Sequence, residues 1–159
     1  MFGPGGAYAP SPAADWHLLV GDASALPAIG VALNRLPVGA PALVFVEVEG
    51  PEEEQRDLVP GAGVELVWLH RGSQAPGRAV VDAVRVAQLP AGTGHVFVHG
   101  EAGLVRELRL HLRAGRGLLP EFTSISGYWR LGRTEEGWRA EKPAWNAEVE
   151  AAEQTLAAR

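Results

Sequence analysis

The sequence has no cysteine, so disulfide bonds, thiolate metal sites and cysteine nucleophiles are all excluded. It also has no apolar run close to the roughly 20 residues that a membrane-spanning helix needs. Residues 1–6 lack the charged and apolar regions of a signal peptide. We therefore expect a cytoplasmic protein without a membrane span, in which any redox chemistry would depend on a cofactor.

Positive charge is also scarce. Lys142 is the only lysine, and 14 Lys and Arg face 19 Asp and Glu, which gives a formal net charge of -5. A general nucleic-acid-binding protein needs a basic face for phosphate contacts, so we expect no nucleic-acid partner. The many arginines are explained either by a GC-rich genome or by a preference for bidentate anion contacts.

Several catalytic signatures are missing as well. There is no Gly-x-Gly-x-x-Gly dinucleotide motif and no Gly-Lys-Ser/Thr triphosphate loop. His95 and His99 alternate along one predicted strand, but no third ligand lies at metal-binding spacing, so we expect no metal site. Ser124 and Ser126 lack the glycine-flanked elbow of an esterase.

The hydrophobic pattern predicts one α/β domain. A chain of 159 residues with 47% hydrophobic content is long enough for one compact core. Short apolar runs alternate with helical spacing, which indicates a three-layer, mostly parallel five-stranded sheet of order 3-2-1-4-5. The predicted strands are 16–20, 42–48, 64–69, 95–99 and about 122–126, and the predicted helices are 25–36, 77–89 and 102–114.

The same pattern suggests a division of the chain and a place for a ligand. Residues 1–15 are rich in Gly and Pro and are expected to be a linker. Residues 16–141 are expected to form the domain, and residues 142–159 a carboxyl-terminal helix.

In the predicted strand order the first and fourth strands adjoin, so the loops 21–24 and 100–103 face each other across a crevice at their carboxyl ends. These loops, distant in sequence, therefore form one candidate site.

The first of these loops could hold a pyrophosphate. Gly21 permits a tight turn, and the amides at the start of the next helix form an anion site strengthened by the helix dipole. Asp22 and Ser24 are explained equally well as ordinary turn and cap residues.

Four motifs together resemble the carboxyl-terminal domain of siderophore-interacting proteins. They are Gly21-Asp22-Ala23-Ser24-Ala25-Leu26-Pro27-Ala28-Ile29, then Trp68-Leu69-His70-Arg71-Gly72, Gly100-Glu101-Ala102-Gly103 and Ser126-Gly127-Tyr128-Trp129-Arg130-Leu131-Gly132. In that family, which is related to ferredoxin reductases, a flavin-binding barrel carries FAD and the following α/β domain presents NAD(P)H to it. The resemblance therefore implies a ferredoxin-reductase-like NAD(P)-binding domain that acts in ferric-siderophore reduction.

The resemblance also implies roles for individual residues around the predicted crevice. Gly21, Asp22 and Ser24 would line the approach of the pyrophosphate and nicotinamide, although Ala23 lacks the family's usual carboxylate. Gly100 and Glu101 would lie beside the nicotinamide. An ordinary strand-to-helix turn explains Gly100 and Glu101 as well.

Two further groups lie after the third and fifth predicted strands. His70 and Arg71 could accept the 2′-phosphate of NADPH, or form a solvated loop pair. Tyr128, Trp129, Arg130 and Arg133 are expected to follow the fifth strand and to contact a ferric siderophore or a partner; alternatively, the aromatics cover the end of the sheet while the arginines extend to solvent.

The sequence has no Arg-x-Tyr-Thr/Ser flavin motif, so FAD would be held only by a separate or missing domain. Without an acceptor flavin, no catalytic residue is assigned within this chain. The leading hypothesis is an NAD(P)H-binding domain that contributes to ferric-siderophore reduction with a flavin domain supplied elsewhere. The alternatives are a noncatalytic module that binds a siderophore or partner, and a fragment or separately encoded half of a reductase.

Overall fold

Strands and helices alternate along the chain in the computed structural model, which describes residues 10–158. The five strands lie parallel in the order β3-β2-β1-β4-β5, which confirms the predicted topology. Because the order reverses beside β1, the carboxyl ends of the strands form the edge where a ligand site is expected. The strands are β1 (Trp16–Asp22), β2 (Ala42–Val48), β3 (Val64–His70), β4 (Gly94–Glu101) and β5 (Thr123–Trp129).

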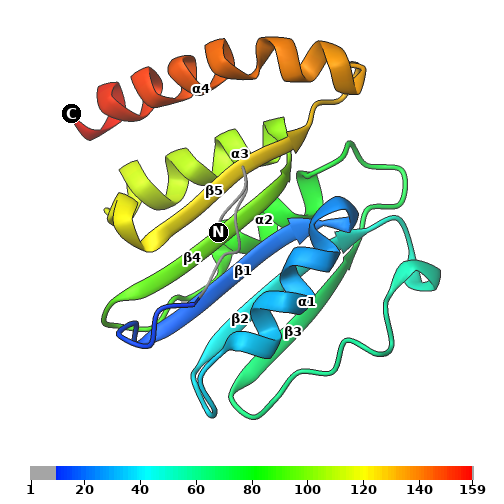
Figure 1. The fold of residues 1–159 in the computed structure, drawn as a ribbon, viewed down its shortest axis with the longest axis vertical. Helices are drawn as coiled ribbons and strands as arrows, with labels where there is room; N and C mark the ends of the chain where they lie inside the picture. The colour runs from blue at the N-terminus through cyan, green and yellow to red at the C-terminus, as the bar shows by residue number, and fades with distance from the viewer. Residues whose placement is uncertain (1–9, 159) are drawn as a thin grey trace.

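Helices cover both faces of the sheet, as Figure 1 shows. One face packs against α1 through Leu19, Ile29 and Phe97, and the other packs against α2 and α3 through residues such as Val84 and Leu108. α4 lies alongside α3 and the edge strand β5. The helices are α1 (Leu26–Arg35), α2 (Arg78–Val86), α3 (Ala102–Arg109) and α4 (Glu135–Ala157), with short helical turns η1 (Ala23–Ala25), η2 (Pro51–Glu53), η3 (Leu110–Gly115) and η4 (Pro120–Phe122).

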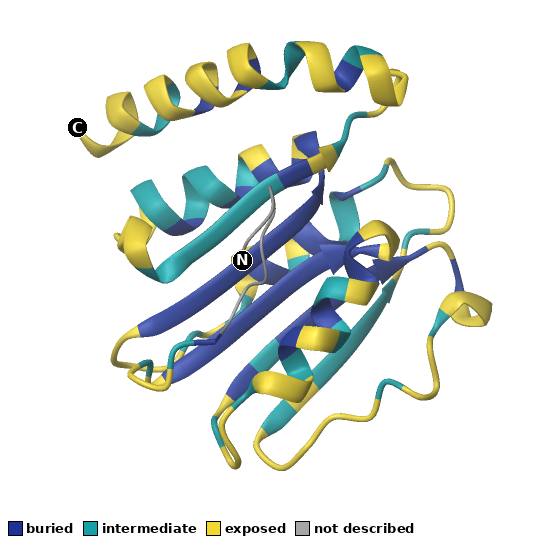
Figure 2. Ribbon diagram, viewed as in Figure 1, coloured by how far each residue is buried: buried dark blue, intermediate teal, exposed yellow. Residues whose placement is uncertain are grey.

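Burial follows the position of each strand in the sheet. β1 and β4 are buried along their whole length, whereas the edge strands β3 and β5 are mostly half-buried (Figure 2). This is the expected result for a parallel sheet, whose central strands are covered on both faces by crossover helices.

Two elements extend beyond their predicted limits. β5 continues to Trp129, so Tyr128 and Trp129 belong to the strand rather than following it. The carboxyl-terminal helix starts at Glu135, because the Thr134 side chain caps it by accepting a hydrogen bond from the Gly137 amide at 2.9 Å. Pro143 lies inside this helix and does not begin it. The predicted linker, residues 1–15, is described only from residue 10 onward.

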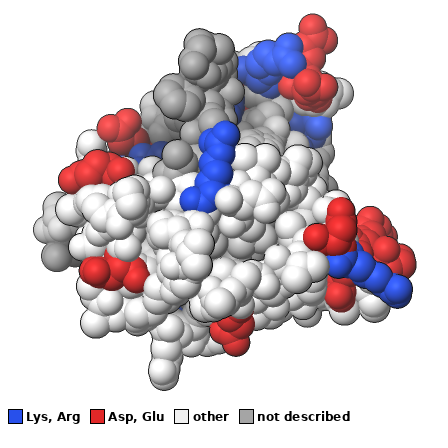
Figure 3. All heavy atoms as spheres, turned by 60° about the horizontal axis from the view of Figure 1, so that its bottom comes forward, with Lys and Arg blue, Asp and Glu red and all other residues white. Residues whose placement is uncertain are grey.

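The Lys and Arg side chains on the face drawn in Figure 3 form no continuous patch, and several of them lie beside Asp or Glu. Within residues 10–158, no helix has the length and apolar character that crossing a membrane requires.

Candidate functional site

Three buried carboxylates lie at the carboxyl edge of the sheet. Asp22 ends β1, Glu101 ends β4, and Glu47 is the penultimate residue of β2. Their exposed fractions are only 7%, 6% and 3% respectively. A buried carboxylate requires hydrogen-bond donors to offset its lost hydration, so the partners of these groups define the site.

Asp22 connects three strands through one carboxylate. It accepts hydrogen bonds from the Ser24 amide at 3.0 Å and from the Ser24 hydroxyl. The amide of Glu101 donates to it at 2.9 Å from the end of β4, and the indole Nε1 of Trp129 donates at 3.0 Å from the end of β5. The predicted proximity of Asp22, Ser24 and Glu101 is thus present in the structure.

Glu101 and Glu47 each accept hydrogen bonds from amides at the start of a helix. Glu101 caps α3 by accepting from the Gly103 amide at 2.8 Å, and it also accepts from the Leu131 amide at 3.2 Å. Glu47 accepts from the amides of Gly77 at 2.7 Å and Val80 at 3.2 Å, at the start of α2. The chain's own carboxylates therefore take helix-end amides that could otherwise bind an anion.

The two loop glycines permit this close packing. A Cβ on Gly21 would lie 2.7 Å from the Cβ of Ala25 and 3.0 Å from the carbonyl oxygen of His99. Gly100 has φ +148°, and a Cβ there would lie 2.8 Å from the carboxylate of Asp22. A side chain at either position would separate the adjoining ends of β1 and β4.

A cavity of about 220 Å³ opens at this edge. It brings together four predicted site residues: Asp22, Ser24, Arg71 and Trp129. Ala23, Glu47, Val48, Glu49, Glu53 and Pro76 complete the lining. Four carboxylates therefore surround the cavity against a single guanidinium.

His70 and Arg71 both have acidic neighbours. His70 Nε2 lies 2.5 Å from the carboxylate of Glu54, and Arg71 lies 3.9 Å from that of Glu49. Arg71 lines the cavity, whereas His70 pairs outside it with the segment that follows η2.

The aromatic and basic residues of the fourth motif diverge. Consecutive side chains of a strand point to opposite faces, so Trp129 reaches Asp22 while Tyr128 packs edge-on against His99 at 5.0 Å. Arg130 and Arg133 both pair with Glu141 of α4, at 3.3 and 3.2 Å. The prediction that the four residues follow β5 is wrong for Tyr128 and Trp129, because β5 is longer than predicted, whereas Arg130 and Arg133 do follow it.

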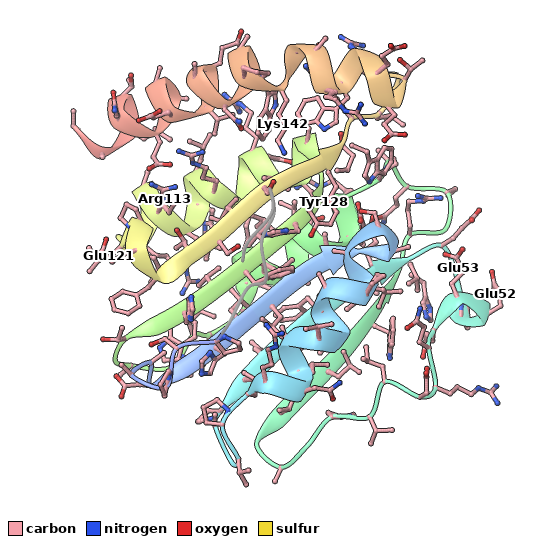
Figure 4. The ribbon with its side chains drawn as sticks, in the orientation of Figure 1. Glu52, Glu53, Arg113, Glu121, Tyr128 and Lys142 are labelled. Atoms are coloured by element: carbon pink, nitrogen blue, oxygen red, sulfur yellow. The ribbon has the colours of Figure 1, made fainter. Side chains whose placement is uncertain are left out.

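Three histidines lie on the sheet face that carries Tyr128. Burial lowers the pKa of His17, and burial followed by the charge of His17 lowers the pKa of His95. Burial, with a smaller contribution from Lys142, lowers the pKa of His99 to about 4 despite a hydrogen bond that raises it. Figure 4 labels Tyr128 and Lys142 near this face. In the part of the chain that the structure describes, no group of three or more His, Asp or Glu is placed to hold a metal ion.

Burial also raises the pKa of Tyr128, and the charge of Asp22 adds to this shift. The phenol of Tyr128 is therefore kept in its neutral form, which suits its packing against the ring of His99.

Sequence reasoning missed the acidic lining of the cavity. Glu47 gave a usable signal, because it is one carboxylate within the otherwise apolar run 42–48. Glu49 and Glu53 gave none, since charged residues after a strand are normally solvated.

The fold and the cavity define a doubly wound α/β domain, a class in which a ligand binds beyond the carboxyl ends of the strands at the reversal of strand order. This chain belongs to the siderophore-interacting protein family, whose sequence model matches residues 14–132. The family resemblance of the four motifs is thereby confirmed.

Relatives of known sequence are about twice as long as this chain. A Mycobacterium tuberculosis protein without an assigned function is 46% identical over 164 residues, which cover 96% of this chain and 56% of the relative. The ferric vibriobactin reductase ViuB of Vibrio cholerae is 33% identical, over 89% of this chain and 53% of its own length.

Solved structures of siderophore-related proteins share this fold over about half of their length. The siderophore-interacting protein SipS from Aeromonas hydrophila superposes with a TM-score of 0.73 at 29% identity, over 86% of this chain and 53% of that protein. A siderophore utilisation protein from T. fusca has a TM-score of 0.70 at 35% identity, over 79% and 48%. The chain thus spans about half the length of the relatives it matches.

Proposed function

We propose that this domain binds NAD(P)H in the cavity at the carboxyl edge of its sheet and directs the hydride to a flavin held by another domain or polypeptide. The reaction would be the reduction of ferric siderophores in the cytoplasm. The observation that carries the proposal is the cavity itself, because it opens at the carboxyl ends of β1, β2 and β3, beside the reversal of strand order at β1.

The chemistry of the lining suits the sugar and nicotinamide part of such a cofactor. Ribose hydroxyls and a carboxamide NH₂ donate hydrogen bonds, and the carboxylates of Glu47 and Glu49 with the hydroxyl of Ser24 are acceptors. The indole of Trp129 adds a flat apolar surface. A cavity of about 220 Å³ encloses only part of a dinucleotide, so the rest would lie along the open edge or against a partner domain.

The flavin belongs to a partner in this proposal. NAD(P)H supplies a hydride when bound, and hydride transfer requires the donor and acceptor rings in contact. The absence of an Arg-x-Tyr-Thr/Ser segment and the double length of the relatives support a flavin-binding domain or subunit outside this sequence.

The test is calorimetric titration of the chain with NADH and with NADPH, beside a variant that fills the cavity. Ala23→Trp suits this purpose, since Ala23 is exposed and lines the cavity. We expect at least about a tenfold loss of affinity in this variant. Ala147→Trp is the matched control, because Ala147 is equally exposed but lies on α4.

An absence of heat with both dinucleotides would refute the proposal. The noncatalytic siderophore- or partner-binding module would then be the remaining function, and titration with a ferric siderophore would test it.

A further inference from the structure

We infer that the cavity selects NADH over NADPH, and that Glu49 and Glu54 set this preference by engaging Arg71, which lines the cavity, and its neighbour His70. The inference rests on the proposed binding of a nicotinamide dinucleotide. It concerns the adenosine ribose, whose 2′ position carries a hydroxyl in NADH and a phosphate in NADPH.

Two basic side chains at this end of the cavity, His70 and Arg71, could receive a 2′-phosphate. A 2′-phosphate site needs an available Arg, His or Lys with donors directed at the phosphate oxygens. His70 is held by Glu54 at 2.5 Å, and the guanidinium of Arg71 faces Glu49 at 3.9 Å. A phosphate at this end of the cavity would have to displace both carboxylates.

The carboxylates that line the cavity also oppose a phosphate. Glu53 lines the same side of the cavity, and its carboxylate accepts a hydrogen bond from the Glu49 amide at 2.7 Å, which fixes it beside the end of β2. Glu47 and Asp22 contribute two further carboxylates from the floor. A phosphate monoester carries roughly -1.5 to -2 charges at pH 7, so it would meet net repulsion here.

Glu49 is placed to accept a hydrogen bond from the 2′-hydroxyl that NADH carries instead of the phosphate. Glu49 directly follows β2, and in dinucleotide-binding α/β domains an acidic residue at that position accepts a hydrogen bond from the ribose 2′-hydroxyl. The side chain of Glu49 is 64% exposed, so it can turn toward a ribose without breaking a buried contact. The same carboxylate thus attracts a hydroxyl and repels a phosphate.

Solvent limits the size of the preference for NADH. The charges lie at an open edge where water and salt screen them, so we expect NADH to bind about tenfold more tightly than NADPH at low ionic strength. The ratio should shrink as salt is added, because screening weakens the repulsion of the phosphate and leaves the hydroxyl contact unchanged.

The experiment measures both dissociation constants by calorimetry on the 159-residue chain at low and high salt. Glu49→Gln and Glu54→Gln release Arg71 and His70, and each should move the NADH to NADPH ratio toward NADPH by roughly threefold or more. Glu52→Gln is the matched control: it removes one charge from η2, between Glu49 and Glu54 in the sequence, but Glu52 does not line the cavity (Figure 4). Thermal unfolding of each variant verifies folding.

The outcomes separate this inference from the function on which it rests. Equal affinity for the two cofactors, or tighter binding of NADPH, overturns the inference and leaves the proposed function intact. A ratio that Glu49→Gln and Glu54→Gln move no further than Glu52→Gln does also overturns it. If neither dinucleotide binds, the proposed function itself fails.

Discussion

Asp22 is the residue on which the geometry of the cavity depends most. Its carboxylate accepts from groups on η1, β4 and β5 and is 7% exposed. Asp22→Asn places an NH₂ donor among these donors and removes the charge that strengthens their hydrogen bonds. We expect a loss of about 3 kcal/mol in the free energy of unfolding, measured by urea denaturation.

The control for this prediction is Asp82→Asn. Asp82 makes an exposed i,i+4 ion pair with Arg78 at 3.0 Å, so the same substitution should cost less than about 0.5 kcal/mol. Similar losses in the two variants would show that Asp22 has no special role.

His99 gives the protein a predictable response to acid. Its pKa is lowered from 6.5 to about 4 chiefly by burial, so the unfolded chain binds a proton in this range that the folded chain does not. Stability is therefore complete above pH 6.5, decreases as the pH falls from 6.5 to 4, and changes no further below the folded pKa on account of this group. The contribution of His99 to the loss by pH 4 is about 3 kcal/mol.

His99→Gln removes this titration. The free energy of unfolding of both proteins should be measured from pH 8 to pH 4, where the value at pH 8 gives the packing cost of the substitution itself. That cost includes the stacking of His99 on Phe97 at 3.9 Å and its contact with Ser124 at 3.0 Å. A pH dependence identical to that of the unmodified protein would contradict the prediction.

Sequence and structure agree on single residues where the interaction is local. Capping by Asp22 and Glu101 could be predicted, because each follows a strand and precedes a helix. The hydrogen bond from Trp129 to Asp22 joins residues 107 positions apart, and only the folded sheet creates it. The pairing of Glu49 with Arg71 depends in the same way on the neighbouring ends of β2 and β3.

At the scale of elements, α4 adds a layer that the sequence indicated only in part. Trp138, Trp145 and Val149 are buried against the core that α2 and α3 cover, and the two indoles pack edge-to-face at 5.4 Å. The presence of a terminal helix was predicted over residues 142–159, whereas the helix starts at Glu135. The Thr134 cap and tertiary packing on α3 outweigh the cost of Pro143 inside the helix.

Glu153 links the carboxyl-terminal part of α4 to two arginines of α3 and η3. Its carboxylate pairs with Arg109 at 2.6 Å and Arg113 at 3.0 Å, and all three side chains are at most 16% exposed. Glu153→Gln removes the carboxylate that pairs with two largely buried guanidinium groups. The free energy of unfolding should fall by about 2 kcal/mol in urea denaturation.

Glu135→Gln provides the comparison for α4. Glu135 pairs with Arg139 at 3.0 Å on the exposed surface of the same helix, and its loss should cost less than about 0.5 kcal/mol. If Glu153→Gln proved as mild, the packing of the indoles alone would hold α4 in place.

At the scale of the whole molecule, the strand order was predictable because it follows from general rules. Alternating strands and helices require right-handed crossovers, and few arrangements of five strands satisfy that condition. The sign of the charge around the cavity was not predictable, because it depends on which loop side chains turn inward. A site expected to receive a pyrophosphate therefore has its nearby helix-end amides occupied by internal carboxylates.

The flavin partner that we propose leads to a prediction for a fused protein. By itself the chain should reduce no ferric siderophore with NADH, because the hydride lacks an acceptor. Joining the part of the Mycobacterium tuberculosis relative that this chain does not cover to residues 1–159 should create NADH-dependent reduction at least about tenfold above the chain alone. The rate is followed by the loss of the ferric-siderophore absorbance under anaerobic conditions.

Two variants of the fused protein show where the activity arises. Ala23→Trp should abolish NADH-dependent reduction while dithionite, which reduces flavin directly, still supports it. Ala147→Trp should retain both activities, since Ala147 lies on α4 away from the cavity. If Ala23→Trp left the NADH-dependent rate unchanged, the hydride would reach the flavin without passing through this cavity, and the residues at the carboxyl edge would serve the fold alone.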